Sequence, residues 1–115
     1  MIDWEDLAQG QIAEIQCALP ESIRARAIEV PVFLSRAEHR KSGACLGVFE
    51  GYSLLDGPPT QPDEMPRITL FFDTLARAAN YRKTVFLREV RITYLHELGH
   101  YFGWDEEQIT NVGLA

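Results

Sequence analysis

Positive charge is scarce in this sequence of 115 residues. Lysine and arginine together number 11 against 17 aspartates and glutamates, which gives a net charge of -6. Proteins that bind nucleic acids or anionic membranes concentrate lysine and arginine on one surface, and no such cluster occurs in this sequence. We therefore expect neither a nucleic-acid partner nor a membrane partner.

Long apolar runs are also missing. No stretch approaches the roughly 20 apolar residues that a helix needs to span a bilayer. The first six residues, 1–6, are acidic, whereas secretion and transit leaders are basic. The sequence therefore predicts a cytoplasmic protein. Because 46% of its residues are apolar, a chain of this length is expected to fold as one domain over residues 1–115.

Cysteine is rare as well, with Cys17 and Cys45 as the two examples. Two cysteines are too few for a disulfide framework, and their spacing matches no zinc-binding motif. Both stand among apolar neighbours in the sequence. We therefore expect reduced, buried thiols without a redox role.

The hydropathy pattern predicts an α+β domain with helices at both ends. Residues 2–19 have helical periodicity with Asp3 as the N-cap, and residues 84–102 form the longest helix. Thr84 is the expected N-cap of this long helix, and Gly103 follows its last turn, where a left-handed C-terminal residue is common. Three segments rich in β-branched and aromatic residues are expected to be strands: 28–33, 45–52 and 67–72.

Two short helices complete the prediction. One occupies residues 73–80, after the third strand. The other opens at Asp105, with Gln108 three residues later as its capping-box partner. The stretch 56–63 is rich in proline and glycine and is expected to be a surface loop.

The longest predicted helix carries the motif His96-Glu97-Leu98-Gly99-His100. Histidines four residues apart project from one face of a helix, so both imidazoles can bind the same tetrahedral metal ion. Glu97 lies beside them, where it can take a proton from water. Catalytic zinc has three protein ligands, and a carboxylate among residues 105–107, just beyond the Gly103 turn, can supply the third.

The extended form of this motif is unusual for a chain of this composition. Chance would place His-Glu-x-x-His in roughly 0.7% of such chains. Requiring a glycine at Gly103 and an acid at Glu106 as well lowers that frequency to roughly one in ten thousand. The pattern therefore favours a metal site over two unrelated surface histidines.

From His96 to Glu106 the sequence resembles the long zinc signature of metzincin-type zincins, with Glu106 where those proteins carry His or Asp. More closely, the stretch from Arg67 through the long helix resembles a family of small, single-domain bacterial zincin-like proteins called minimal metalloproteases. The resemblance covers most of the chain. It implies a zincin-like fold, in which a mixed sheet of three or four strands packs on the long metal-binding helix.

Carried over residue by residue, the resemblance implies a zinc-dependent metallopeptidase that holds one Zn²⁺. His96 and His100 are then metal ligands, Glu106 is the third ligand, and Glu97 is the general base. Because Glu is longer than the Asp usual at the third position, Asp105 or Glu107 could take that place instead. In zincins an edge strand pairs with an extended peptide substrate. The strands at 45–52 and 67–72 are both candidates for this edge.

Other interpretations of the motif stay open. The first is a non-catalytic binding module that keeps the zincin scaffold and recruits a protein partner. Fe²⁺ could occupy the same ligands, although Glu97 would have no purpose there. A purely structural zinc is disfavoured because such sites usually have four ligands, often cysteines.

Three residues near the motif are weaker candidates for the site. Glu89 shares the face of His96 and could orient an imidazole, although an ion pair on its own helix is as plausible. Tyr101 is expected to pack, with a transition-state hydrogen bond as its alternative role. His39 is expected to be an exposed loop residue.

Overall fold

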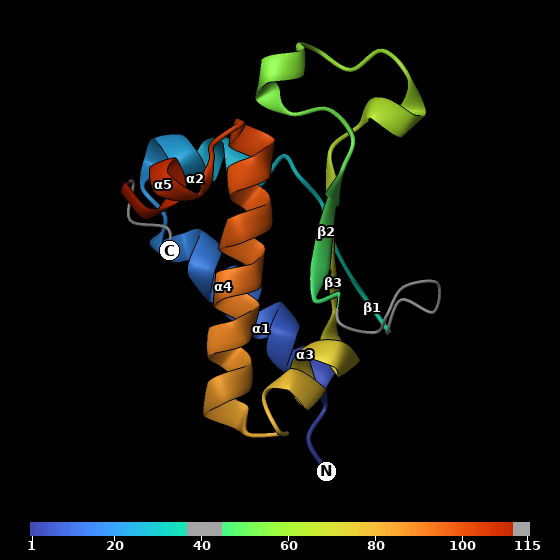
Figure 1. Cartoon of the computed structure of the whole chain (residues 1–115), viewed down its shortest axis with the longest axis vertical. Coiled ribbons are helices and arrows are strands. Elements are labelled where there is room, and N and C mark those ends of the chain that lie inside the picture. The colour runs from blue at the N-terminus through green and yellow to red at the C-terminus, as the bar shows by residue number, and fades with distance from the viewer. Residues whose placement is uncertain (37–44, 112–115) are drawn as a thin grey trace.

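A three-stranded mixed sheet lies beside a long helix in the computed structural model, which describes residues 1–36 and 45–111 (Figure 1). The strands are β1 (Val32–Ser35), β2 (Gly47–Glu50) and β3 (Arg67–Phe71), in the spatial order β1-β3-β2. β1 runs parallel to β3, and β2 runs antiparallel to it. This arrangement confirms the predicted α+β class with a small mixed sheet on a long helix.

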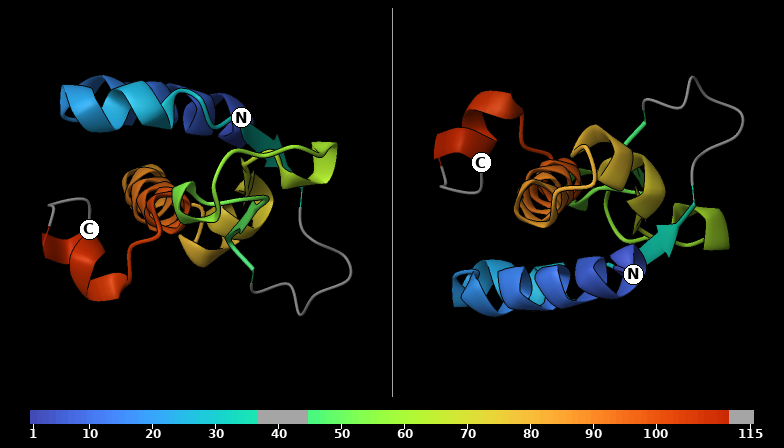
Figure 2. Two further views of the ribbon diagram at one scale, coloured as in Figure 1. Left: turned by 90° about the horizontal axis from the view of Figure 1, so that it is seen from above. Right: turned by 90° about the horizontal axis from the view of Figure 1, so that it is seen from below.

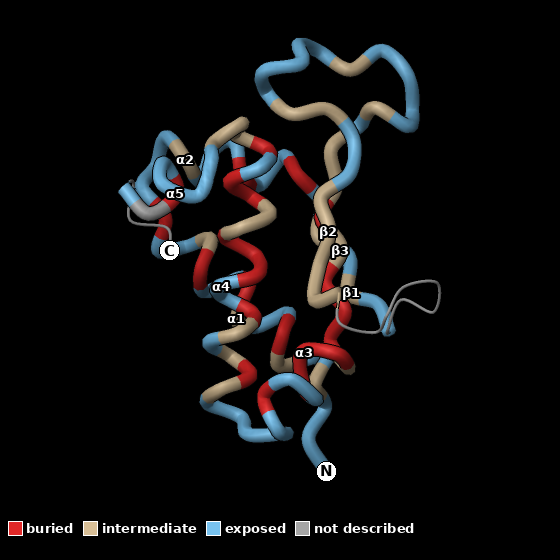
Figure 3. The backbone as a smooth tube through the Cα atoms, viewed as in Figure 1, coloured by how far each residue is buried: buried red, intermediate tan, exposed pale blue. Residues whose placement is uncertain are grey.

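Helices α1 (Trp4–Ala18) and α4 (Lys83–Phe102) pack against each other and against the sheet (Figure 2). Their buried faces meet the buried strand residues Ile68 and Leu70 in one hydrophobic core (Figure 3). The Gln16 side chain of α1 also donates a hydrogen bond to the Tyr94 hydroxyl of α4 at 3.1 Å. Within the two described ranges, no helix combines the length and the apolar character that crossing a membrane requires.

Helix α1 begins as predicted, because the Asp3 carboxylate accepts a hydrogen bond from the Asp6 backbone N–H at 3.1 Å. Its buried residues follow the helical repeat: Ala8, Ile12 and Ile15. Cys17 lies two positions beyond Ile15 and is exposed, because two helical steps turn a side chain to nearly the opposite face. The prediction of two buried thiols is therefore wrong for Cys17, and Cys45 is half-buried.

The first strand begins four residues later than predicted. Helix α2 (Glu21–Ala27) extends into further turns, because the N–H groups of residues 28–30 all donate back to carbonyls of that helix. These residues therefore cannot pair with a strand, and β1 replaces the predicted strand at 28–33. The other two strands lie inside their predicted ranges.

Helix α4 also starts slightly earlier than predicted. Arg82 is the N-cap residue and makes no side-chain capping bond, whereas Thr84 already lies in the first turn. The C-terminal end is as predicted, since Gly103 adopts the left-handed conformation with a φ of 78°. The expected short helix after β3 is α3 (Phe72–Ala78).

The last helix, α5 (Glu106–Asn111), turns back beside α4 after Gly103 (Figure 2). Its Ile109 side chain is buried against Gly99 of α4, and a Cβ atom on Gly99 would collide with it. The missing side chain at Gly99 therefore provides the space in which α5 docks.

Residues 52–66 form a lobe above the sheet (Figure 1). It contains two 3-10 turns, η1 (Leu54–Asp56) and η2 (Pro62–Glu64). The Glu64 carboxylate accepts hydrogen bonds from the Thr60 backbone N–H, at 2.8 Å, and from the Tyr52 hydroxyl. The Thr60 N–H, together with its neighbouring donors, lowers the pKa of Glu64 below the ordinary value of 4.5. The predicted surface loop is therefore a structured lobe built around one carboxylate.

We expect Gly99→Ala to undock α5, because the added methyl group occupies the space of Ile109. Exposing an isoleucine costs roughly 1.5–3 kcal/mol, and alanine in a helix returns about 0.5–1 kcal/mol. Urea unfolding should therefore show a net loss of about 1–2 kcal/mol, with faster amide exchange in α5.

Gly10→Ala in α1 is the matched control, because nothing lies within 4 Å of its added Cβ atom. This variant should gain about 0.5–1 kcal/mol of unfolding free energy. Equal stabilisation by both substitutions would show that Gly99 is not the docking point.

Acid is expected to loosen the lobe. A carboxylate whose pKa is lowered on folding contributes stability above its unfolded pKa, and this contribution is lost as the pH falls through the folded value. An NMR titration that follows the Thr60 amide should therefore have its midpoint below pH 4.5, and Glu64→Gln should abolish the transition. A midpoint above 4.5 would contradict the role given to Glu64.

Candidate metal centre

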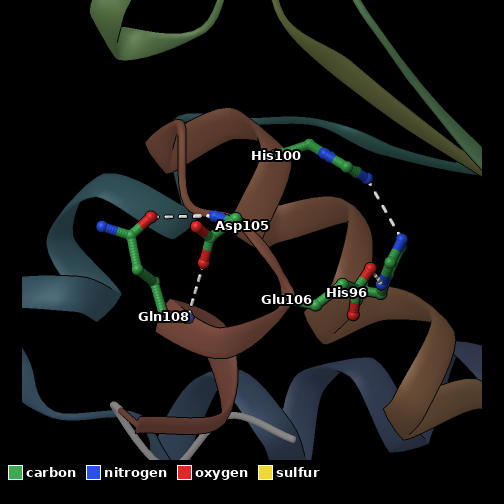
Figure 4. Close-up of polar contacts among 5 residues, drawn as sticks. All are labelled: His96, His100, Asp105, Glu106 and Gln108. Atoms are coloured by element: carbon green, nitrogen blue, oxygen red, sulfur yellow. Dashed lines mark hydrogen bonds and ion pairs between the residues drawn. The ribbon is translucent and has the colours of Figure 1, made fainter.

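His96 and His100 stand on one face of α4, one turn apart and close to the end of the helix (Figure 4). Their Nε2 atoms are 3.1 Å apart, and the two rings meet edge-on with centroids 4.7 Å apart. Two nitrogens bound to one tetrahedral zinc ion lie about 3.3 Å apart, given Zn–N bonds of about 2.0–2.1 Å. The pair therefore fits a single zinc ion with only a small adjustment.

Glu97 contributes a carboxylate beside this pair. Its ligand atom and those of the two histidines all lie within 4.8 Å of one another. Burial raises the pKa of Glu97 above its ordinary value, whereas His100, His96 and a hydrogen bond from the Phe49 backbone N–H act in the opposite direction. A carboxylate held in this way next to two metal-binding nitrogens is placed to accept a proton from water.

Glu106, the first residue of α5, reaches His96 from the side (Figure 4). Its Oε1 atom lies 3.1 Å from Nδ1 of His96, whereas Nε2 of the same ring faces His100. A carboxylate at Nδ1 holds the proton there and leaves the Nε2 lone pair for an ion. Glu106, the predicted third ligand, thus contacts the imidazole of His96 but lies outside the cluster of His96, Glu97 and His100.

The two other acidic residues of this segment differ from Glu106. The Asp105 carboxylate accepts from the Gln108 backbone N–H at 2.8 Å, and the Gln108 side chain accepts from the Asp105 N–H at 2.9 Å. This reciprocal pair is the predicted capping box, and it turns Asp105 toward the first turn of α5 (Figure 4). Glu107 is exposed and lies outside the His96–Glu97–His100 cluster.

Strand β2 is the edge of the sheet that borders α4, whereas β3 is central. Gly47 approaches the helix so closely that an added Cβ atom would lie 2.8 Å from Thr93 Cγ2. Leu46 pairs with β3 through a 3.0 Å hydrogen bond from the Phe71 N–H. Along an antiparallel strand, residues whose backbone N–H and C=O face the partner strand alternate with residues whose groups face outward. Leu46 faces β3, so the backbone N–H and C=O of Gly47 and Phe49 point away from it.

A hollow of about 340 Å³ adjoins His96 along this edge. Leu46 and Ile92 supply apolar surface, and His96 and Glu97 form part of the same wall. The arrangement places an apolar depression, an open strand edge and a carboxylate next to a pair of metal-binding nitrogens.

Several contacts at the site were not predicted from the sequence. The Phe49 N–H that holds Glu97 is a backbone group, which no side-chain pattern reveals. The docking of α5 at Gly99 had one signal, a glycine inside an apolar helix. Tyr101 packs as expected, with its ring against Phe49 at a centroid distance of 6.0 Å. His39 lies outside the described residues.

Comparison with known families gives one match. A family model of zincin-like metallopeptidases matches residues 22–114, which include the sheet, α4 and α5. No curated protein matches the sequence. The family implies a zinc cofactor, and the paired Nε2 atoms of His96 and His100 have the donor chemistry and the spacing that zinc requires. The chain therefore belongs to the zincin-like metallopeptidase family.

Proposed function

We propose that the protein is a zinc-dependent peptidase, in which His96 and His100 hold the metal ion. The observation that carries this proposal is the 3.1 Å separation of their Nε2 atoms, with the Glu97 carboxylate alongside. When bound, zinc lowers the pKa of water and polarises the carbonyl of a peptide bond.

Glu97 performs the proton transfers in this proposal. Its carboxylate takes a proton from the attacking water and later delivers it to the nitrogen of the leaving amine. The Phe49 N–H donates to this carboxylate and limits its rotation. The half-buried position of Glu97, against β2, keeps the proton acceptor on the side where a paired substrate would lie.

The substrate in this proposal is an extended peptide that pairs with the free edge of β2. The Gly47 N–H and the Phe49 C=O are the outward groups left for such pairing, because the Phe49 N–H donates to Glu97 and the Gly47 C=O accepts from Cys45 Sγ. A substrate side chain enters the neighbouring hollow, where Leu46 and Ile92 favour an apolar group. We propose a soluble, cytoplasmic enzyme that needs neither nucleic acid nor membrane.

Glu106 completes the metal site in one of two ways. Rotation of its exposed side chain would make it the third ligand, as the family resemblance implies. In its present position on Nδ1 it instead orients His96, and water takes the third place. Removal of an orienting carboxylate typically weakens metal binding 10- to 100-fold, whereas removal of a direct ligand has a larger effect.

Metal content is expected to be about one zinc per chain in untagged protein purified without chelator, measured by elemental mass spectrometry. His96→Ala and His100→Ala should lose this zinc. For Glu106→Gln, a roughly 10- to 100-fold weaker affinity in competition with a chromophoric chelator indicates the orienting role, and complete loss indicates a direct ligand.

Glu107→Gln is the control for this series, because it removes a neighbouring carboxylate that lies outside the cluster. It should bind zinc as the unmodified protein does. Failure of the unmodified protein to bind zinc, even when titrated with it, would refute the proposed function.

We expect Glu97→Gln to retain zinc and to lose peptide hydrolysis, since the amide cannot accept the proton. Loss of a general base typically lowers the rate on the order of 10²- to 10⁴-fold. The assay is cleavage of a fluorogenic peptide library with varied apolar residues, and Glu107→Gln again serves as the control. If Glu97→Gln and the unmodified protein behave alike in every assay, the scaffold is a binding module for a protein partner.

A further inference from the structure

A second hollow lies between the lobe and α2, at the upper end of α4. Its volume is about 440 Å³, within the range of roughly 300–1,000 Å³ that is usual for small-molecule sites. It shares no lining residue with the hollow beside the histidines. The metal centre therefore does not account for it.

Tyr101 gives this hollow a polar group on a largely buried side chain. The side chain lines the hollow, and the residue is only 5% exposed. Its ring packs against Phe49 and Phe102, but among residues 1–36 and 45–111 no hydrogen-bond partner meets its hydroxyl. Because this hydroxyl is not shut off from solvent, it is available for a hydrogen bond to a molecule that enters the hollow.

Arg26 and Glu29 line the hollow as well. They form an ion pair at 3.6 Å, and each side chain is more than half exposed. The opposite charges balance, so this pair offers donors and an acceptor without favouring an anion or a cation.

The remaining walls are apolar and already formed. They come mainly from the lobe: Leu54, Pro58, Pro59, Met65 and Pro66. Tyr52 adds an aromatic ring, and its hydroxyl is already bonded to Glu64. The flat surfaces of the prolines and Tyr52 can pack against a ring. These side chains have little conformational freedom, so binding would cost little of their entropy.

We propose that this hollow binds a small neutral molecule with an apolar ring and a polar group that both donates and accepts hydrogen bonds, such as a primary amide. The ring lies against the lobe. The carbonyl oxygen accepts a hydrogen bond from the Tyr101 hydroxyl, and the amide nitrogen donates to Glu29. This site does not depend on the metal ion or on the proposed peptidase activity.

The two methionines provide a direct test. Met65 lines the hollow, whereas Met1 lies at the opposite end of the molecule, so the signals of protein labelled with ¹³C at the methionine methyl groups separate the site from its control (Figure 1). Titration with 3-phenylpropanamide should shift the Met65 signal saturably and leave Met1 unchanged. The charged analogues 3-phenylpropanoate and 3-phenylpropylammonium should bind several-fold more weakly. No shift of Met65, or equal binding of all three probes, would overturn the proposal.

Tyr101→Phe should weaken binding of 3-phenylpropanamide about fivefold, because it removes one hydrogen bond and leaves the ring in place. Tyr94→Phe is the matched control: this buried tyrosine is also on α4, but its hydroxyl accepts from Gln16 and lies outside the hollow. Equal affinities of the two variants would refute the role of Tyr101. His96→Ala should bind the probe unchanged, and loss of binding there would assign the probe to the metal centre instead.

Discussion

The packing of β2 against α4 is the contact on which the proposed chemistry depends. Gly47 has no side chain, so the strand approaches Thr93 closely enough for the next outward-facing backbone N–H, that of Phe49, to reach Glu97. A bulkier residue at Gly47 would move the strand away and leave a half-buried carboxylate without this donor. The same close approach leaves the outer edge of β2 beside His96, where the proposed peptide would pair with it. One small residue therefore sets both the position of the proposed proton acceptor and the strand edge along which the proposed substrate would lie.

Helix α4 belongs both to the hydrophobic core and to the candidate metal site, because one face of the helix is buried and another carries the histidines. Tyr94 and Leu98 are fully buried on one side, and they anchor the helix against α1 and the sheet. The paired histidines project from another side, with His100 exposed and His96 partly so. Since a rigid, packed helix fixes the directions of its side chains, the 3.1 Å spacing of the two Nε2 atoms is present before any ion binds. Less reorganisation is then needed when zinc enters.

Local patterns predicted the parts of the structure that local interactions determine. The i, i+4 spacing placed His96 and His100 together, Gly103 ended α4, and Asp105 with Gln108 began α5. Errors arose where a local sequence pattern was compatible with two different structures. Residues 28–30 have a strand-like composition, but their N–H groups bond back to α2. Cys17 has apolar neighbours in the sequence but lies on the outer face of α1. Neither the second hollow nor the contact between Phe49 and Glu97 could be predicted, because each joins segments far apart in the sequence.

The position of Glu106 shows why the metal site cannot be derived from its motif alone. The motif fixes only the number of residues between His96 and Glu106, whereas the approach of the carboxylate depends on how α5 docks. That docking places Ile109 in the space beside Gly99 and directs Glu106 toward Nδ1 of His96. A histidine that is held at Nδ1 presents Nε2 to the ion in a fixed tautomer, so the contact favours metal binding even without a direct bond. In the proposed zinc site, Gly99 would therefore influence metal affinity through the helix that it allows to dock, although it contacts no metal itself.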